Sequence, residues 1–259
     1  MKVLMLGDVM GRPGRRAVDL LLPSLRQELR VDLAIANGEN TAAGRGLTLP
    51  TARELFEAGV DVITSGNHIW DQKEIIPSLD EDAPILRPHN YPPGTPGRGV
   101  ITLNGTTIIN LQGRTFMIPL DCPFRTADAM LRELPQGSVI IVDMHAEATS
   151  EKVGLGWYLD GRVSAVLGTH THVGTVDARV LPRGTAFVCD VGMVGSRDSI
   201  IGDEVDSVLS RFLTQRPNRL HVAENSRILQ FNSVLIDIDE GTGRARSIVR
   251  VDREVERRD

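Results

Sequence analysis

Two histidines lie two positions apart in the segment AVLGTHTHVGT, residues 165–175, directly after an apolar run that ends in glycine. Residues at i and i+2 of an extended segment project to the same side, so His170 and His172 could bind one metal ion or two adjacent ions. The pair by itself has a plainer interpretation, in which polar residues mark the place where a buried strand reaches the surface. Which interpretation holds depends on the other side chains that the fold brings to the same place.

Four further polar clusters stand at or just beyond the end of an apolar run. These clusters are Asp8, Glu39 with Asn40, Asn67 with His68, and His145. Taken singly, each could be structural, because Asp and Asn cap helices and a lone histidine is often a satisfied buried residue. Ligands of open α/β sheets gather at the carboxyl ends of the strands, however, so the five clusters together favour a shared site.

The elements that must position these residues follow an alternating pattern. Short Val/Ile/Leu-rich runs alternate with helical patterns, which predicts an α/β fold with parallel strands and crossover helices. Strands are expected near residues 2–7, 31–38, 60–66, 138–147, 163–173 and 186–192, and helices near 15–30, 48–59, 126–134, 150–161 and 203–215. Antiparallel hairpins are expected around Asn104–Gly105 and within residues 232–252. The chain shows no repeats or linkers, so we expect a single domain over residues 1–259.

Composition excludes several classes of function. The net charge of −5 argues against a general affinity for duplex nucleic acid, which depends on clustered Lys and Arg. Cys122 and Cys189 form no CxxC pair, so neither a disulfide framework nor a thiolate zinc site is expected. No stretch approaches the ~20 apolar residues of a membrane span, and the N-terminus does not resemble a signal peptide. We therefore expect a cytoplasmic protein without a membrane partner.

The candidate ligands indicate which metals could bind. Imidazole suits zinc, manganese, iron and nickel, whereas magnesium and calcium prefer oxygen ligands, so the mixed set favours transition metals. The candidates are Asp8, Glu39, Asn40, Asn67, His145, His170 and His172. They exceed the needs of one tetrahedral ion but suit two ions that share a carboxylate. Two such ions about 3.5–4 Å apart can stabilise the attacking and leaving oxygens of a displacement at phosphorus, so the set indicates phosphoester hydrolysis.

The motifs GDVMG, NGEN, GNHIW, DMHAE and GTHTHV, in this order, resemble those of the calcineurin-like metallophosphoesterases. Met10 stands where many members have a metal-binding histidine, and Glu39 stands where most have a bridging aspartate. Both departures, with Asn40 beside Glu39, are similar to the YmdB-like branch of this superfamily. The resemblance runs over essentially the whole chain, including the segment LPRGTAFVCDVGMVGS.

The resemblance implies a four-layer αββα metallophosphoesterase sandwich with mixed sheets and a centre of two metal ions, iron or manganese in first place and zinc as a further choice. It assigns Asp8, Glu39, Asn40 and His172 to one ion and Glu39, Asn67, His145 and His170 to the other. Glu39 would bridge the two ions, and we expect Asn40 to supply the coordination lost through Met10. His68 would be the general acid that protonates the departing alkoxide.

The function implied by the resemblance is that of a binuclear metal-dependent phosphodiesterase, a phosphoric diester hydrolase. A hydroxide bridging the metals would attack cyclic nucleotides, with 2′,3′-cyclic nucleotides as the first expectation and 3′,5′-cyclic nucleotides as a second. The alternatives are a phosphomonoesterase or nuclease with the same centre, and a slow-turnover regulatory binding protein. The expected partner is a small-molecule phosphodiester substrate, and a homo-oligomer is left open.

Several weaker signals surround these motifs. Arg12, Arg15, Arg16 and Arg45 lie in Gly-containing loops after Asp8 and Asn40 and could contact a phosphate, although a solvated helix start is the favoured interpretation for Arg15 and Arg16. Trp70 could line the pocket or pack in the core. His89 and His221 lack the strand-end context of the other histidines, so we expect them to be structural or exposed.

Overall fold

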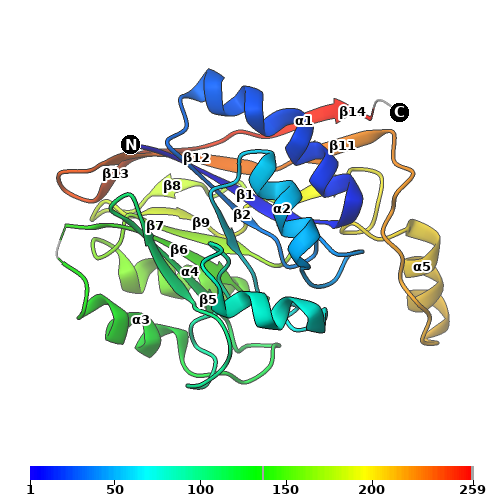
Figure 1. Cartoon of the computed structure of the whole chain (residues 1–259), viewed down its shortest axis with the longest axis horizontal. Coiled ribbons are helices and arrows are strands. Elements are labelled where there is room, and N and C mark those ends of the chain that lie inside the picture. Colours follow the sequence, from blue (N-terminus) through cyan, green and yellow to red (C-terminus); the bar gives the residue numbers. More distant parts are fainter. Residues whose placement is uncertain (136, 258–259) are drawn as a thin grey trace.

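The protein consists of two β-sheets packed face to face, with helices on the outer side of each. The computed structural model describes residues 1–135 and 137–257. Helices α1 (Gly11–Leu29) and α2 (Leu49–Glu57) cover one side, and α3 (Pro123–Leu131) and α4 (Thr149–Leu159) cover the other (Figure 1). This arrangement confirms the α/β class and the four-layer sandwich with mixed sheets.

Among the described residues, eight strands form the first sheet. They are β1 (Lys2–Val9), β2 (Leu33–Asn37), β3 (Val62–Thr64), β10 (Met193–Ser196), β11 (Ile228–Phe231), β12 (Ser233–Asp239), β13 (Arg244–Arg250) and β14 (Arg253–Glu256). The central strand β1 runs parallel to β2 and β10 and antiparallel to β12. From Val3 to Val9 it is buried throughout, which explains its nearly continuous apolar sequence.

Six described strands form the second sheet. They are β4 (Val100–Leu103), β5 (Thr106–Gln112), β6 (Val139–His145), β7 (Ala165–Thr169), β8 (Arg179–Val180) and β9 (Ala186–Val188). The four inner strands are parallel, and β4 and β8 are antiparallel edges. The two expected hairpins are confirmed as β4-β5 and β12-β13. The sequence pattern does not predict the short strands β8, β10, β11 and β14.

Three apolar cores hold the four layers together. Leu4 of β1 packs with Leu22 of α1 in the core between the first sheet and its helices. Met5 packs with Ile141 of β6 in the core between the two sheets. Leu155 of α4 belongs to the third core, on the outer face of the second sheet. Successive residues of β1 therefore face different cores, because side chains alternate across a strand.

The helices begin where local sequence permits. Helix α1 starts at Gly11 rather than near Arg15 as predicted, because Pro13 is tolerated in a first turn, where its missing N–H has no partner to lose. Helix α2 begins close to its predicted start, directly after the N-cap Thr48, whose hydroxyl accepts a hydrogen bond from the N–H of Thr51. Within residues 1–135 and 137–257, no helix combines the length and apolar character needed to cross a lipid bilayer.

Helix α5 (Val205–Thr214) stands off the body of the protein, and the chain that follows it returns along its side (Figure 1). Val208 is its buried residue, whereas Leu209, Phe212 and Leu213 are exposed. Arg211 Nε donates to Asn218 Oδ1 at 3.2 Å and ties the helix to the returning segment. We call residues 203–225 the α5 arm.

Two glycines let strands of the sheets approach unusually closely just before the candidate metal ligands. A Cβ at residue 7 would lie 1.9 Å from the carbonyl oxygen of Gly192, and one at residue 168 would lie 1.7 Å from that of Cys189. No other residue could occupy these positions without moving the backbone. Gly7 and Gly168 thus place Asp8 and the two-histidine segment.

Replacing Gly168 with alanine should force β7 away from the segment after β9. We expect the free energy of unfolding to fall by about 1–3 kcal/mol or more, the usual cost of overpacking. Gly154→Ala is the matched control, because its added Cβ would meet no atom closer than 3.6 Å and alanine favours a helix over glycine by about 0.5–1 kcal/mol. Urea denaturation compares the two variants. Equal stabilities would contradict the close-approach argument.

Candidate metal centre

The seven candidate ligands meet where the carboxyl ends of strands from both sheets come together. Asp8 lies in β1, Glu39 and Asn40 follow β2, and Asn67 follows β3, all in the first sheet. His145 ends β6 in the second sheet, and His170 and His172 follow β7. The shared edge expected from the sequence is therefore divided between two sheets. The packing of the sheets against each other, in addition to the order of strands within one sheet, assembles the cluster.

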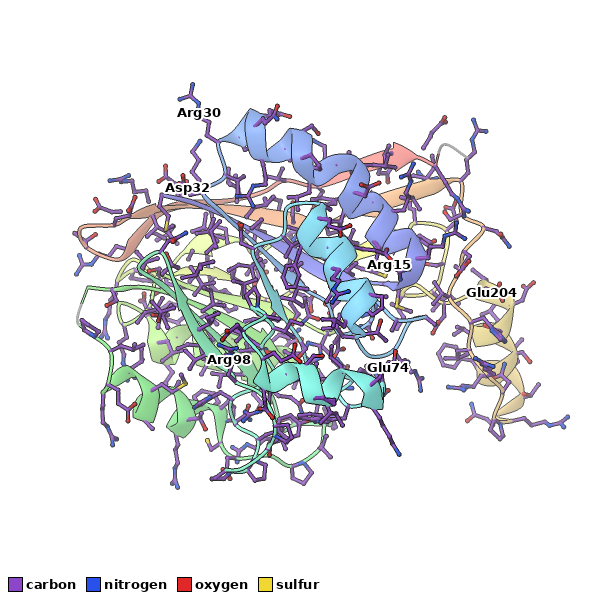
Figure 2. The ribbon with its side chains drawn as sticks, in the orientation of Figure 1. Arg15, Arg30, Asp32, Glu74, Arg98 and Glu204 are labelled. Carbon is purple, nitrogen blue, oxygen red and sulfur yellow. The ribbon has the colours of Figure 1, made fainter. Side chains whose placement is uncertain are left out.

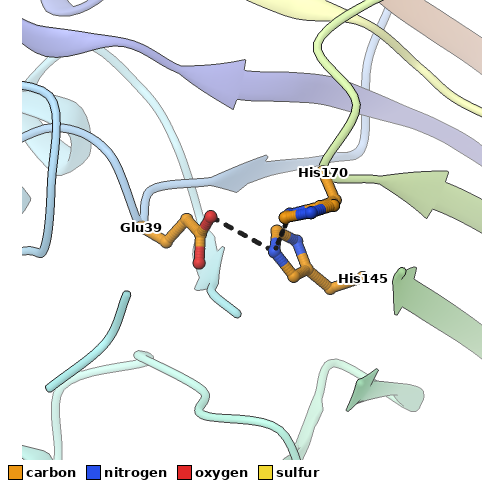
Figure 3. A group of neighbouring side chains, drawn as sticks. All are labelled: Glu39, His145 and His170. Carbon is orange, nitrogen blue, oxygen red and sulfur yellow. Dashed lines mark hydrogen bonds and ion pairs between the residues drawn. The ribbon is translucent and has the colours of Figure 1, made fainter. Parts of the chain in front are cut away.

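Three of the candidates converge on a nitrogen atom of a fourth, Nε2 of His145. This atom lies 3.2 Å from Glu39 Oε1 and 3.0 Å from His170 Nδ1 (Figure 3). It also lies 3.1 Å from Asn67 Oδ1. Among the described residues, Glu39, His145 and His170 also form a group whose donor atoms all lie within 4.8 Å of one another. These four residues are the set that the resemblance assigns to one ion.

The other expected set adjoins the same oxygen of Glu39, Oε1. Asn40 Nδ2 is 3.2 Å from His172 Nε2 and 3.3 Å from Glu39 Oε1. Asp8 Oδ1 is 3.9 Å from His172 Nε2. Glu39 thus contacts members of both sets, which is the position required of a bridging carboxylate.

The donors also fit cations chemically. Asp8 is fully buried, and its Oδ2 accepts a hydrogen bond from the backbone N–H of His170 at 3.0 Å. Its Oδ1 has no hydrogen-bond partner among the described residues. An unpaired buried carboxylate oxygen is costly, and a cation is the partner that would relieve this cost.

The charges of the buried carboxylates and histidines depend on one another. Burial opposes charge on His145, but the carboxylates of Glu39, Asp8 and Asp143 outweigh it and raise the pKa of His145 to about 9. Burial likewise opposes charge on Glu39, but His145 and the backbone N–H of His68 overcome it and lower the pKa of Glu39 to about 2. A histidine must lose its proton to bind a metal. A divalent cation would therefore replace the charge-balancing proton of His145.

A buried polar chain that the sequence analysis missed orients His145. Nδ1 of His145 lies 3.0 Å from Thr169 Oγ1, and the Thr169 hydroxyl donates to Asp143 Oδ1 at 2.7 Å. The Thr169 oxygen can thus accept from Nδ1, which leaves Nε2 for a cation. Asp143 stands two residues before His145 on the same face of β6. This spacing could have indicated from the sequence that the two side chains lie close together.

The segment with the two histidines has an unusual backbone that a buried ion pair supports. His170 and His172 have φ values of 100° and 64°, in the left-handed region that non-glycine residues seldom adopt. Between them, Thr171 donates from its N–H and its hydroxyl to Asp190 Oδ2, at 3.1 and 2.7 Å. The same oxygen accepts from Lys152 Nζ at 2.6 Å, and both side chains are almost completely buried. The ion pair thus holds the strained segment that carries two candidate ligands.

His68 lies beside the cluster and does not contact the converging atoms through its ring. Its Nδ1 lies 2.8 Å from Asp71 Oδ2, and its backbone N–H donates to Glu39 Oε2 at 3.0 Å. The ring lines a hollow of about 310 Å³ at the cluster, together with Glu147, which the sequence analysis missed and which lies 3.0 Å from His170 Nε2. His68 therefore faces the space that a substrate would enter.

The weaker sequence signals divide between this hollow and other parts of the structure. Of the four arginines, Arg45 lines the hollow. Arg15 instead pairs with Glu54 between α1 and α2 (Figure 2), and Arg16 pairs with Asp19. Arg12 lies with Arg15 and Arg16 in a separate surface depression. Trp70 packs edge-on against Tyr91 and adjoins the first core, as its packing interpretation expects.

Breaking the buried ion pair should destabilise the protein. Lys152→Met leaves Asp190 charged and buried, and loss of one partner of such a pair costs about 3–5 kcal/mol. The double variant Lys152→Met/Asp190→Asn should recover part of this loss, because asparagine removes the buried charge and keeps an acceptor for Thr171. Chemical denaturation of both variants measures the difference. Wild-type stability of the single variant would show that the pair does not support the segment.

Comparison with known proteins identifies the family. Residues 4–251 match the family model described as YmdB-like protein. The 2′,3′-cyclic-nucleotide 2′-phosphodiesterase of Bacillus subtilis (strain 168) is 48% identical over 97% of this chain and 96% of that protein. The crystal structure of a hypothetical protein from Thermus thermophilus has a TM-score of 0.91 at 49% identity, covering 98% of this chain and 99% of the other. A novel phosphatase from Mycoplasma pneumoniae has a TM-score of 0.92 at 32% identity, covering 99% and 94%. As the motifs implied, this chain belongs to the YmdB-like protein family.

Proposed function

We propose that this protein is a phosphodiesterase that holds two transition-metal ions and hydrolyses 2′,3′-cyclic nucleotides. The observation that carries the proposal is the position of Glu39, which contacts two sets of donor atoms and the backbone of His68. The Bacillus subtilis relative supports the substrate class, because its similarity extends over nearly the whole of both chains. The Mycoplasma pneumoniae phosphatase supports phosphoester hydrolysis more generally.

The two donor sets would each hold one ion, with Glu39 shared between them. Asp8, Asn40 and His172 would complete one set, and Asn67, His145 and His170 would complete the other. The mixture of imidazole, amide and carboxylate suits iron or manganese and also accommodates zinc. When bound, such ions supply a nucleophile at neutral pH and neutralise charge on the phosphoryl oxygens.

His68 is the residue placed to protonate the leaving oxygen. Asp71 engages Nδ1 of its ring, which leaves Nε2 as the nitrogen that can transfer a proton. The hydrogen bond from the His68 backbone to Glu39 fixes the ring relative to the donor sets. A sugar alkoxide is a poor leaving group, so a cyclic nucleotide needs this proton.

Three alternatives receive less support. The 3′,5′-cyclic nucleotides find no support among the relatives compared, and we leave them out of the proposal. A phosphomonoesterase or nuclease would use the same donors, but the Bacillus subtilis relative favours the cyclic diester. A regulatory protein that binds without turnover would have no need of the His68–Asp71 pair.

Removing one ligand should remove one ion. We expect Asn40→Ala to bind one ion per chain where the wild type binds two, because Asn40 contacts His172 and Glu39 and would replace the coordination lost through Met10. Asn40→Asp is the control and should keep both ions, since a carboxylate oxygen can substitute for the amide oxygen. Elemental analysis and calorimetric titration of metal-stripped protein with Mn²⁺ give the stoichiometry. Two ions in Asn40→Ala would exclude Asn40 as a necessary ligand.

The role of His68 can be separated from metal binding by the choice of leaving group. With Mn²⁺, His68→Ala should lower kcat on 2′,3′-cyclic AMP by about 10²–10⁴-fold, the usual contribution of a general acid. Activity on bis(p-nitrophenyl) phosphate should fall much less, because nitrophenolate leaves without a proton. Equal losses on both substrates would remove His68 as the acid.

The same assay tests the substrate class when wild-type protein is given 3′,5′-cyclic AMP, AMP and uncleaved single-stranded RNA in parallel. Turnover of 2′,3′-cyclic AMP above the others is the expected result. Activity confined to AMP or to internal bonds of RNA would overturn the proposal.

A further inference from the structure

A second and larger hollow adjoins the one at the candidate metal centre. Its volume is about 850 Å³, compared with about 310 Å³ for the hollow at the donor cluster. The two share Gly44, Arg45, Asp203 and Leu220 in their walls. Pockets that bury a small-molecule ligand span about 300–1,000 Å³. The hollow at the centre stands at the lower end of this range, and the adjoining hollow is large enough to hold a further nucleotide.

The walls of the larger hollow come from distant parts of the sequence. One wall is the loop after β2, residues 42–45, with Gln72. The opposite wall is the α5 arm, whose helix begins next to Glu204 (Figure 2). The arm stands off the body of the protein (Figure 1), and residues of the arm and of the loop line the hollow together. A substrate bound at the donor cluster could therefore extend between the arm and the loop without displacing a packed element.

The chemistry of the lining fits one nucleotide better than a simple polyanion. Arg45 and Arg219 supply cations and His221 supplies an imidazole, and neither arginine has an ion-pair partner in the described part of the chain. Asp203, Glu204 and Glu224 line the same space, so it is not uniformly basic. A long run of phosphates would be repelled by these carboxylates, whereas one phosphodiester could bind at a guanidinium.

Amide groups supply the remaining recognition chemistry. Gln72 and Asn225 line the hollow with side-chain amides. Gln72 Nε2 donates to the carbonyl of Arg45 at 2.9 Å, which leaves its Oε1 as an acceptor, and the Asn225 amide can donate and accept. Such groups, with the glutamates, match the edges of an unpaired base, which single-stranded RNA exposes and a duplex does not. Cation and amide together indicate a ligand with one phosphate and one exposed base beyond the reacting group.

We propose that the substrate is the 2′,3′-cyclic phosphate end of a single-stranded oligoribonucleotide, with the nucleotide before the end lying in the larger hollow. This inference rests on the proposed function and specifies its substrate. The phosphodiester that joins the last two nucleotides lies at Arg45, on the shared wall, and the preceding nucleotide lies against Arg219 and His221. In the reaction, a water oxygen bonds to phosphorus, one ring P–O bond breaks, and the released ribose oxygen takes a proton. The product is a terminal phosphomonoester, and no further reactant is needed.

The test compares two substrates that share the reacting group. With Mn²⁺-loaded protein, kcat/KM is measured for 2′,3′-cyclic AMP and for tetra-adenylate that ends in a 2′,3′-cyclic phosphate. We expect kcat/KM to be about tenfold or more higher for the tetranucleotide, the gain expected from one or two charge-assisted contacts. The variant Arg219→Ala/His221→Ala should lose this gain and keep its kcat/KM on 2′,3′-cyclic AMP within about twofold.

A charge control separates the hollow from general attraction of an anion. Arg244 is exposed at the start of β13, at the end of the molecule opposite α5 (Figure 1). Arg244→Ala should keep the full preference for the tetranucleotide, and a matching loss in this control would overturn the inference.

The remaining outcomes distinguish the inference from the proposed function. Equal kcat/KM for both substrates, or a gain that survives Arg219→Ala/His221→Ala, would overturn the inference and leave the proposed function standing. Turnover of neither substrate by metal-loaded protein would overturn the proposed function itself.

Discussion

The buried carboxylate of Glu39 is the constraint on which the rest of the site depends. A charged group removed from water is costly unless other groups replace its solvation. Here the replacements are His145 at the end of β6, Asn40 after β2 and the backbone N–H of His68 after β3. The fold must bring these three parts of the chain to one point. The close strand approach at Gly7 and Gly168 and the three separate cores can be understood as the means of doing so.

The division of the donors between two sheets has an energetic consequence. Side chains on one sheet edge are positioned by strand pairing alone, whereas Glu39 and His145 are positioned by the apolar core between the sheets. Strain at the two histidines adds to this dependence, because each left-handed residue costs on the order of 1–3 kcal/mol. The Lys152–Asp190 pair, itself expensive to bury, offsets that strain through Thr171. The protein thus accepts strained backbone and a buried ion pair at this segment, and in return the two histidines are held in fixed positions.

The sequence was sufficient to predict some parts of the structure and insufficient for others, for physical reasons. Asp8, Glu39, Asn67 and His145 follow apolar strands, and this local pattern is enough to place them at strand ends. Lys152 was missed because a lysine early in a helix is normally solvated, and its burial depends on Asp190, 38 residues away. Asp190 follows β9 and could have been found by the same strand-end pattern.

Short strands and the larger hollow are harder to predict. Strands β10 and β11 have four residues each and are defined by pairing with β1 and with each other, which no local pattern reveals. The hollow has walls from residues 42–45, Gln72 and the α5 arm, so it exists only after folding. The residues of the candidate metal centre can therefore be predicted from the sequence more readily than the larger hollow beside it.

Met10 lines the hollow at the candidate metal centre and packs against the loop that forms one wall of the larger hollow. It stands where many related enzymes have a metal-binding histidine, and here it is buried. A Cβ on Gly202 would lie 2.4 Å from Met10 Cγ, and one on Gly44 would lie 3.1 Å from Met10 Cε, so the thioether chain packs directly against both glycines. Gly44 belongs to the loop that walls the larger hollow, and Gly202 directly precedes the α5 arm. A histidine at this position would bind metal through a rigid ring, whereas the flexible apolar side chain of methionine fills the gap between loop and arm. Under the proposed function, methionine at this position would give up one ligand, which Asn40 would supply, and its packing would hold in place the two walls between which a longer substrate would lie.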